Sequence, residues 1–203
     1  MPKYIAIAAS VALFLAAGTS AAFASTQGYY FSGLGGASWM PSLGFVDGAG
    51  HSKTTFDTGY VIGGALGYDT GTGWRYELDS VYQMSGLSRF NGAAAPGHLR
   101  STSLMLNTTY DLFPNEPFTP YVGAGVGVQE VGGSVNGMRG DDWKPAYQLE
   151  AGLRHDLTQD TSIFAEYRFS QSDAVRLTSA IDTGNQHFSD HMLLAGISIH
   201  LGQ

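Results

Sequence analysis

The chain has 203 residues, of which only 13% are charged, 28 are glycine and none is cysteine. The lack of cysteine excludes a disulfide scaffold and cysteine-ligated zinc or iron–sulfur sites. A formal net charge of −7 offers no basic surface for nucleic acid, and an aromatic content of 12% excludes an acidic disordered tail.

The first 24 residues are organised like a secretory signal peptide. Lys3 is followed by an apolar run over 4–17 and then by the small–x–small tripeptide at 22–24. This run is shorter than the ~20 residues that a helix needs to cross a bilayer, so we interpret it as a cleaved signal and not as an anchor. No later apolar stretch is long enough for a membrane helix. We expect cleavage near Ala24 and one exported domain over 25–203.

Apolar and polar side chains alternate along the rest of the chain. Trp74, Tyr76 and Leu78 alternate with Arg75 and Glu77, and this period of two is typical of a strand with one apolar face. The same pattern predicts eight strands of roughly ten residues. They lie at about 28–38, 58–69, 74–84, 99–113, 120–130, 146–157, 162–170 and 192–201, and the facing of the first two is not clear.

The connections between these strands alternate in length. Those at 69–73, 113–117 and 158–160 are tight and rich in turn-forming residues. The longer ones are rich in Gly, Ser, Asp and Asn and lie at 39–56, 85–98, 132–143 and 172–187. Short turns at one end and long loops at the other predict an all-β fold, an eight-stranded antiparallel up-and-down β-barrel.

Such a barrel is either soluble, like a lipocalin, or transmembrane. Aromatic residues lie near the ends of the apolar faces, as in the girdles of outer-membrane barrels. The predicted girdle is Trp74, Tyr82, Tyr110, Tyr147, Tyr167 and Phe169. Few charges remain to keep a soluble barrel dissolved, so the pattern favours a transmembrane barrel.

Several motifs, in this order and spacing, resemble the outer-membrane β-barrel family of small surface proteins, which includes the OmpA-like, OmpX-like and Opa-type barrels. They are Tyr29-Tyr30-Phe31-Ser32-Gly33, Gly63–Asp69, Arg75–Asp79, Pro120–Gly127 and Glu166–Arg168. The resemblance implies an outer-membrane location in a Gram-negative bacterium, contact with outer-membrane lipids and lipopolysaccharide, and insertion by the outer-membrane assembly machinery. It also implies a non-enzymatic role in envelope integrity and in surface interaction or adhesion, with a host or surface ligand bound by the long loops.

The polar faces of the predicted strands hold four acids and four arginines. A lumen of eight strands is filled by side chains, and buried charges there are expected to pair. The predicted salt-bridge network is Arg75, Glu77, Asp79, Arg100, Glu150, Arg154, Glu166 and Arg168, with charges that cancel. Asp69, Asp111 and Asp156 are assigned to the short turns.

Basic residues near the loop end suit the phosphates of lipopolysaccharide. The predicted outer-rim contacts are Arg89, Arg100, Arg139 and Lys144. The short turns at the other end are acidic, and the preference of exposed turns for acidic residues is sufficient to explain this.

Two alternatives to this function remain. Gly123, Gly125 and Gly127 remove volume from one wall of the lumen, which leaves a narrow pore for small solutes or ions open. His187 and Ser189 resemble the His-x-Ser of lipid A deacylases, but Asp190 follows where that family has asparagine, and no glutamate lies beyond Glu166 to orient the histidine. We therefore expect no catalytic residue, no metal site and no cofactor.

Overall fold

The computed structural model describes residues 27–40, 43–47, 50–90, 93–94, 98–114, 116–134, 142–178 and 183–201. The predicted signal peptide at 1–24 lies outside them. No helix formed by these residues is long and apolar enough to cross a membrane.

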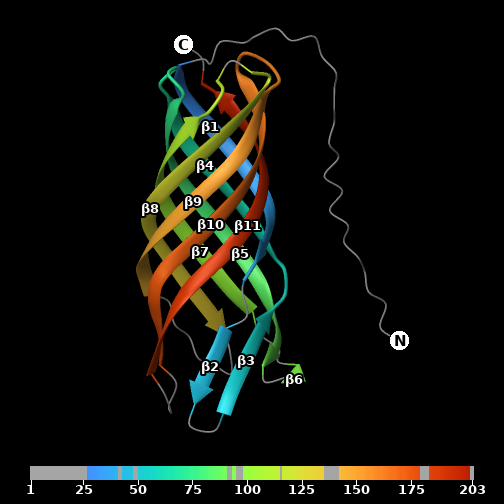
Figure 1. Ribbon diagram of the computed structural model, residues 1–203, viewed down its shortest axis with the longest axis vertical. Coiled ribbons are helices and arrows are strands. Elements are labelled where there is room, and N and C mark those ends of the chain that lie inside the picture. The colour runs from blue at the N-terminus through green and yellow to red at the C-terminus, as the bar shows by residue number, and fades with distance from the viewer. Residues whose placement is uncertain are drawn as a thin grey trace, which may run out of the picture.

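Eight antiparallel strands form a closed barrel (Figure 1), which confirms the predicted fold class. The strands are β1 (Gly28–Trp39), β4 (Gly59–Asp69), β5 (Trp74–Phe90), β7 (His98–Asp111), β8 (Phe118–Ser134), β9 (Asp142–Asp156), β10 (Thr161–Thr178) and β11 (Thr183–His200). Each pairs with the next in chain order, and β1 pairs with β11 to close the sheet.

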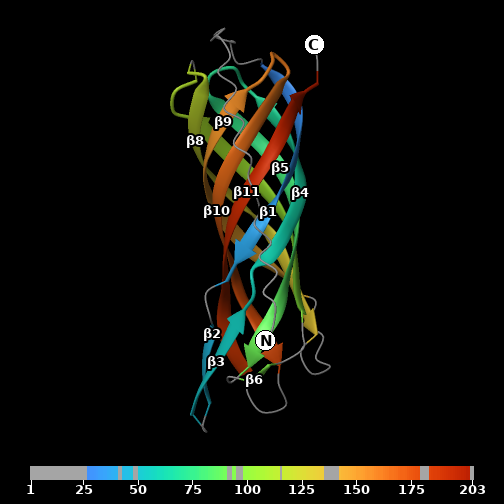
Figure 2. The same ribbon diagram turned by 90° about the vertical axis from the view of Figure 1, so that its right-hand side faces the viewer.

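The two ends of the barrel differ. The turn end holds the short connections β4–β5, β7–β8 and β9–β10, and Gly71 and Gly73 have φ values of 72° and 90° in the first of these. Such positive values favour glycine. At the loop end, β2 (Leu43–Asp47) and β3 (Gly50–Phe56) form a hairpin that pairs with the extension of β5, as does β6 (Ala93–Ala94). Figure 2 shows these three strands beyond the barrel wall.

The alternation of side chains is the reverse of that in a soluble barrel. Large apolar side chains cover the exterior, with Ile62, Leu106 and Val126 each at least 60% exposed. Charged and polar side chains such as Asp79 and Arg168 are buried in the lumen. This arrangement suits a barrel surrounded by lipid, because an apolar exterior in water would be costly.

The structure also gives the facing of the first two strands, which the sequence did not. Tyr30, Ser32 and Leu34 of β1 point into the lumen, as do Val61 and Ala65 of β4. The intervening residues face outward. These two strands are glycine-rich on both faces, which is why alternation alone did not reveal their orientation.

Two glycines accommodate tyrosine rings on neighbouring strands. Gly67 lies beside Tyr30 and Gly152 beside Tyr121 in the strand pairing. A Cβ added at Gly67 would lie 2.2 Å from the Tyr30 ring, and one added at Gly152 would lie 2.4 Å from the Tyr121 ring. Each glycine therefore lets a large ring lie flat against the lumen wall.

Candidate functional site

The charged half of the lumen lies toward the turn end and is organised around Arg168. Its guanidinium contacts Asp79 at 2.6 Å, Glu166 at 2.8 Å and Glu150 at 3.3 Å. The Arg168 side chain is 2% exposed. Because one arginine serves three carboxylates from three other positions in the barrel wall, it ties β5, β9 and β10 together across the lumen.

A second group of charges closes the turn end. Asp111 forms salt bridges with two arginines. One carboxylate oxygen lies 2.9 Å from the guanidinium of Arg75, and the other lies 2.8 Å from that of Arg154. Arg154 also lies 3.4 Å from Asp156, and Arg75 lies 3.9 Å from Glu77. Asp111 is therefore the bridge that joins β5, β7 and β9 at the turn end.

Two tyrosines connect the charged groups. Tyr30 donates a hydrogen bond to Glu77, and Tyr121 donates one to Glu166 at 2.8 Å. The guanidinium of Arg75 lies 4.9 Å from the centre of the Tyr121 ring, within the range of a cation–π interaction. The tyrosines thus satisfy carboxylates that the three arginines do not fully reach.

Seven of the eight residues of the predicted network lie in this part of the lumen, and Arg100 does not. Arg100 is exposed on the outer face of β7, the same face that carries Leu104 and Leu106. Asp111 has the opposite parity, so it faces inward and is 1% exposed, although it was assigned to a turn. Strand β7 includes Asp111 as its last residue.

The predicted cancellation of lumen charge is also wrong. Among the described residues, three arginines face five carboxylates inside the charged half of the lumen, those of Glu77, Asp79, Asp111, Glu150 and Glu166, and a sixth, Asp156, lies partly exposed at its rim. Asp69 and Asp190 are buried in the lumen wall as well. If every group inside were ionised, the described lumen would carry a formal charge of −4 from these residues. The lumen is therefore an acidic environment.

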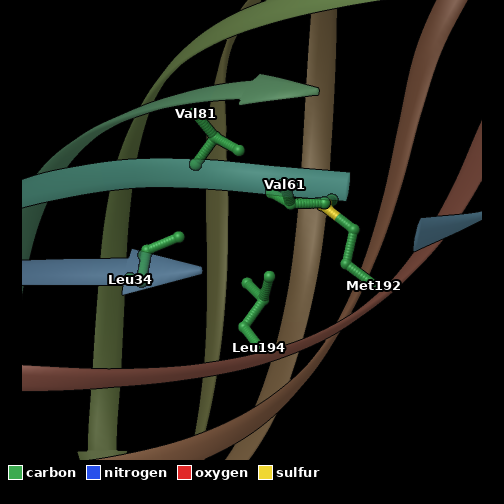
Figure 3. Close-up of a cluster of buried hydrophobic side chains, with 5 residues drawn as sticks. All are labelled: Leu34, Val61, Val81, Met192 and Leu194. Atoms are coloured by element: carbon green, nitrogen blue, oxygen red, sulfur yellow. The ribbon is translucent and has the colours of Figure 1, made fainter. Parts of the chain in front are cut away.

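An apolar cluster occupies the lumen above the charged half. Figure 3 shows its five side chains, which come from β1, β4, β5 and β11 and gather in one part of the lumen. They are Leu34, Val61, Val81, Met192 and Leu194, with Phe164 packed against them. The cluster separates the charged half from the loop end along this side of the barrel.

An outer polar ring lies between the apolar cluster and the loop end. Gln83 donates to Ser38 at 2.9 Å, and Gln129 donates to Ser101 at 2.7 Å. All members of the ring are buried. We define it as Ser38, Gln83, Ser85, Ser101, Gln129, Ser170, Ser172 and Asp190.

Aromatic side chains border the apolar exterior at both ends. Trp74 and Tyr110 pack at 4.8 Å near the turn end, where both are exposed. Near the loop end, the Tyr167 hydroxyl and Nδ1 of His191 share a hydrogen bond of 2.7 Å. The His191 ring also stacks on Trp39, with 5.9 Å between the ring centres.

The six predicted girdle positions all lie on the outer face, with Phe169 half-buried against His191. Five further girdle residues were not predicted from the sequence. Tyr29, Trp39 and Tyr68 lie on the first two strands, whose facing was not clear, Phe118 precedes the strand predicted at 120–130, and His191 was not counted because it is a histidine.

The four predicted lipopolysaccharide contacts fall in different places. Arg100 is exposed on the outer face near the loop end. Lys144 shares the lumen-facing side of β9 with Ala146 and Gln148, so its direction does not fit an outward contact. Arg89 lies in the extension of β5, and its side chain is outside the described part of the structure, as is all of Arg139.

Comparisons with known proteins agree with this architecture. The family model of the outer membrane protein beta-barrel domain matches residues 9–200. A protein of Salmonella typhimurium named outer membrane protein PagN is 25% identical over 201 residues, covering 83% of this chain and 84% of that protein.

A second relative, named outer membrane protein and from Gluconacetobacter diazotrophicus, is 30% identical over 138 residues. The match covers 58% of this chain but only 36% of that protein, so the chain spans about a third of that relative's length.

Solved structures show the same fold at low sequence identity. Neisserial surface protein A matches with a TM-score of 0.57 and 17% identity, over 85% of this chain and 97% of that one. OprG from Pseudomonas aeruginosa matches with a TM-score of 0.54 and 14% identity, over 88% of this chain and all of that one. The family match and the closed barrel together show that this chain belongs to the outer membrane protein β-barrel domain family, and its place is the outer membrane of a Gram-negative bacterium.

Proposed function

We propose that this protein is a non-enzymatic surface-interaction protein whose loop end binds a ligand outside the cell. The observation that carries the proposal is the length of the strands at that end. On β11 the outward apolar residues run from Leu193 to Leu201, about the nine residues that a tilted strand needs to cross the membrane. The strand begins ten residues earlier, at Thr183.

These additional residues form an ordered hairpin. The pairing of β10 with β11 continues to Thr178 and Thr183, with one irregularity between Ser172 and Val175. At a rise of ~3.3 Å per residue and a tilt of ~40°, ten residues project about 25 Å beyond the apolar band. The β2–β3 hairpin and the extension of β5 lie at the same end.

The turn end has no comparable extension. Its three connections run over 70–73, 112–117 and 157–160. Short turns are sufficient to connect strands. Ordering the long paired extensions at the loop end costs conformational entropy, which is expected where these residues form a binding surface. We therefore place the interaction surface at the loop end. The proposed function also includes a contribution of the whole protein to envelope integrity.

Adherence of whole cells tests this function. Cells that express the protein are added to cultured epithelial monolayers beside cells with an empty vector, and bound cells are counted. We expect severalfold higher adherence with the protein. A variant in which residues 175–186 are replaced by a two-residue turn should lose this gain, because the outer hairpin is removed.

The control is a variant with the same short turn inserted between Thr158 and Asp160, at the opposite end. Both variants should keep the heat-modifiable gel mobility of a folded barrel. Equal adherence of the hairpin variant and the unaltered protein would contradict the proposal, as would no gain over the empty vector. A deletion strain with unchanged sensitivity to detergent would remove the envelope role.

Arg100 is our proposed contact with lipopolysaccharide, because it faces outward, whereas Lys144, the other predicted basic residue with a described side chain, does not. An arginine suits a phosphate oxygen pair. Substituting Arg100→Ser should reduce the lipopolysaccharide that stays with the purified barrel, and Lys144→Gln, on the lumen-facing side, should not. Similar retention by both variants would exclude this contact. Insertion by the outer-membrane assembly machinery follows from the same proposal of an outer-membrane barrel.

A further inference from the structure

Asp190 is a fully buried carboxylate in the outer polar ring. It lies on β11, directly beyond Met192 of the apolar cluster, and pairs across the sheet with Ser170. Its relative exposure is 0%. Neither of its carboxylate oxygens has a hydrogen-bond partner among the described residues.

The arginines of the lumen are engaged elsewhere. Arg168 is two residues from Ser170 on β10, but all three of its guanidinium nitrogens contact Asp79, Glu150 and Glu166. The Gln83 side-chain amide and the backbone amide of His191 interact with the Asp190 carboxylate, although neither meets hydrogen-bond geometry. Both are neutral, so the charge of Asp190 is not balanced by them. An uncompensated buried charge is strongly unfavourable.

Two serine hydroxyls of the outer polar ring converge beside Gly59 of β4, which has no side chain. A Cβ added at Gly59 would lie 2.1 Å from the Ser85 hydroxyl and 2.7 Å from the Ser38 hydroxyl. Ser38 accepts a hydrogen bond from the Gln83 amide, the same side chain that interacts with Asp190. The Ser85 hydroxyl is buried and has no hydrogen-bond partner among the described residues.

We propose that a small monovalent cation, Na⁺ or K⁺, binds in the outer polar ring between the Asp190 carboxylate and the Ser38 and Ser85 hydroxyls. The donors are oxygens, which hard cations prefer. One carboxylate with neutral hydroxyls balances a single positive charge. The described residues contain no group of three or more His, Cys, Asp or Glu side chains that could hold a metal ion, which disfavours a tightly bound divalent ion.

The apolar cluster lies on the turn side of this site and gives an ion no polar ligands. The cation would therefore exchange with the solution through the loop end. The inference is independent of the surface-interaction function, because it concerns the lumen and not the projecting strands.

The test compares unfolding of the refolded barrel in detergent at one pH and one ionic strength. The salt is NaCl, KCl or the chloride of N-methylglucamine, a cation too large for the site. The measured quantity is the folding equilibrium from urea titration. At ten times the dissociation constant a bound ion should favour the folded state about tenfold. We expect that gain in NaCl or KCl over N-methylglucamine.

In Asp190→Asn the gain should vanish, and it should vanish in Gly59→Ala, which fills the space beside the hydroxyls. The matched control is Glu116→Gln, an exposed carboxylate at the turn end, which should keep the full gain. If Gly59→Ala fails to fold, Asp190→Asn still decides.

Three results would overturn the proposal. One is an equal gain in Asp190→Asn and the unaltered protein. Another is no difference among the three salts, and a more stable Asp190→Asn would then show that the carboxyl simply holds a proton. The third comes from a further arm in which CaCl₂ or MgCl₂ is added to the N-methylglucamine salt: a gain in that arm alone would assign the site to a divalent ion.

Discussion

At the scale of single residues, Asp111 shows how one carboxylate can organise one end of a barrel. It is buried and contacts two arginines from two different strands, one on each oxygen. Each arginine has a second, longer contact, to Glu77 at 3.9 Å or to Asp156 at 3.4 Å. Removing Asp111 would therefore leave Arg75 and Arg154 close together with weaker compensation.

We expect Asp111→Asn to lower the free energy of unfolding by about 3 kcal/mol, the lower part of the range for breaking a buried ion pair. The amide keeps the shape of the side chain but not its charge. Urea titration of the refolded barrel, followed by tryptophan fluorescence, measures this difference.

The matched control is Asp160→Asn, because Asp160 lies exposed in the β9–β10 turn. Its substitution should change the unfolding free energy by less than ~0.5 kcal/mol. Similar effects of the two substitutions would show that the bridge does not stabilise the barrel.

At the scale of strands, tyrosine and glycine pair across the sheet to hold the charged groups in place. Tyr121 lies over Gly152 and donates to Glu166, and Tyr30 lies over Gly67 and donates to Glu77. The same arrangement thus occurs on two separate strand pairs. It depends on register, because each ring needs a glycine directly opposite it.

Gly152→Ala should displace the Tyr121 ring and weaken its hydrogen bond to Glu166. We expect a loss of about 1–3 kcal/mol in unfolding free energy, as for overpacking of a core. The control is Gly33→Ala, since a Cβ at Gly33 meets no atom within 4 Å. A loss that is as large for Gly33→Ala would point to backbone effects of glycine and not to the ring.

Much of the strand-level organisation was predictable from the sequence. Alternation gave the positions of the eight strands and the facing of six, because one face meets lipid and the other the lumen. The same parity contained the information on Arg100 and Asp111: with Leu104 and Leu106 outward, an even-numbered residue faces outward and an odd-numbered one inward.

The remaining features depend on contacts that the sequence does not display. The outer parts of β10 and β11 lie beyond the apolar band, so neither face is marked by hydrophobic residues. The pairing of Tyr30 with Gly67 requires the register of two strands. The partners of Arg168 come from positions far apart in the chain, and Asp190 lies beside a segment that was expected to be a loop.

At the scale of the whole molecule, the lumen contains three successive zones: the charged half, the apolar cluster and the outer polar ring. Charged side chains in the first are tied to one another by short contacts. Passage of an ion would require breaking those contacts and passing the apolar cluster. Both steps are costly in a narrow lumen.

We therefore expect the purified protein to give no stepwise conductance in a planar lipid bilayer. A general porin inserted under the same conditions serves as the positive control, and heat-modifiable mobility confirms that the tested protein is folded. Discrete current steps that scale with the amount of folded protein would contradict this expectation and support the narrow-pore alternative.

The seam between β1 and β11 joins the first strand of the domain to its last. About 140 residues separate them along the chain, so this contact has a high sequence separation and forms slowly. Until the final strand has been synthesised and exported, β1 retains an unpaired edge that can pair with other chains. The domain therefore cannot mature progressively from its N-terminus. It must be held in an unaggregated state until its last twenty residues arrive, and premature termination anywhere before them leaves an open sheet.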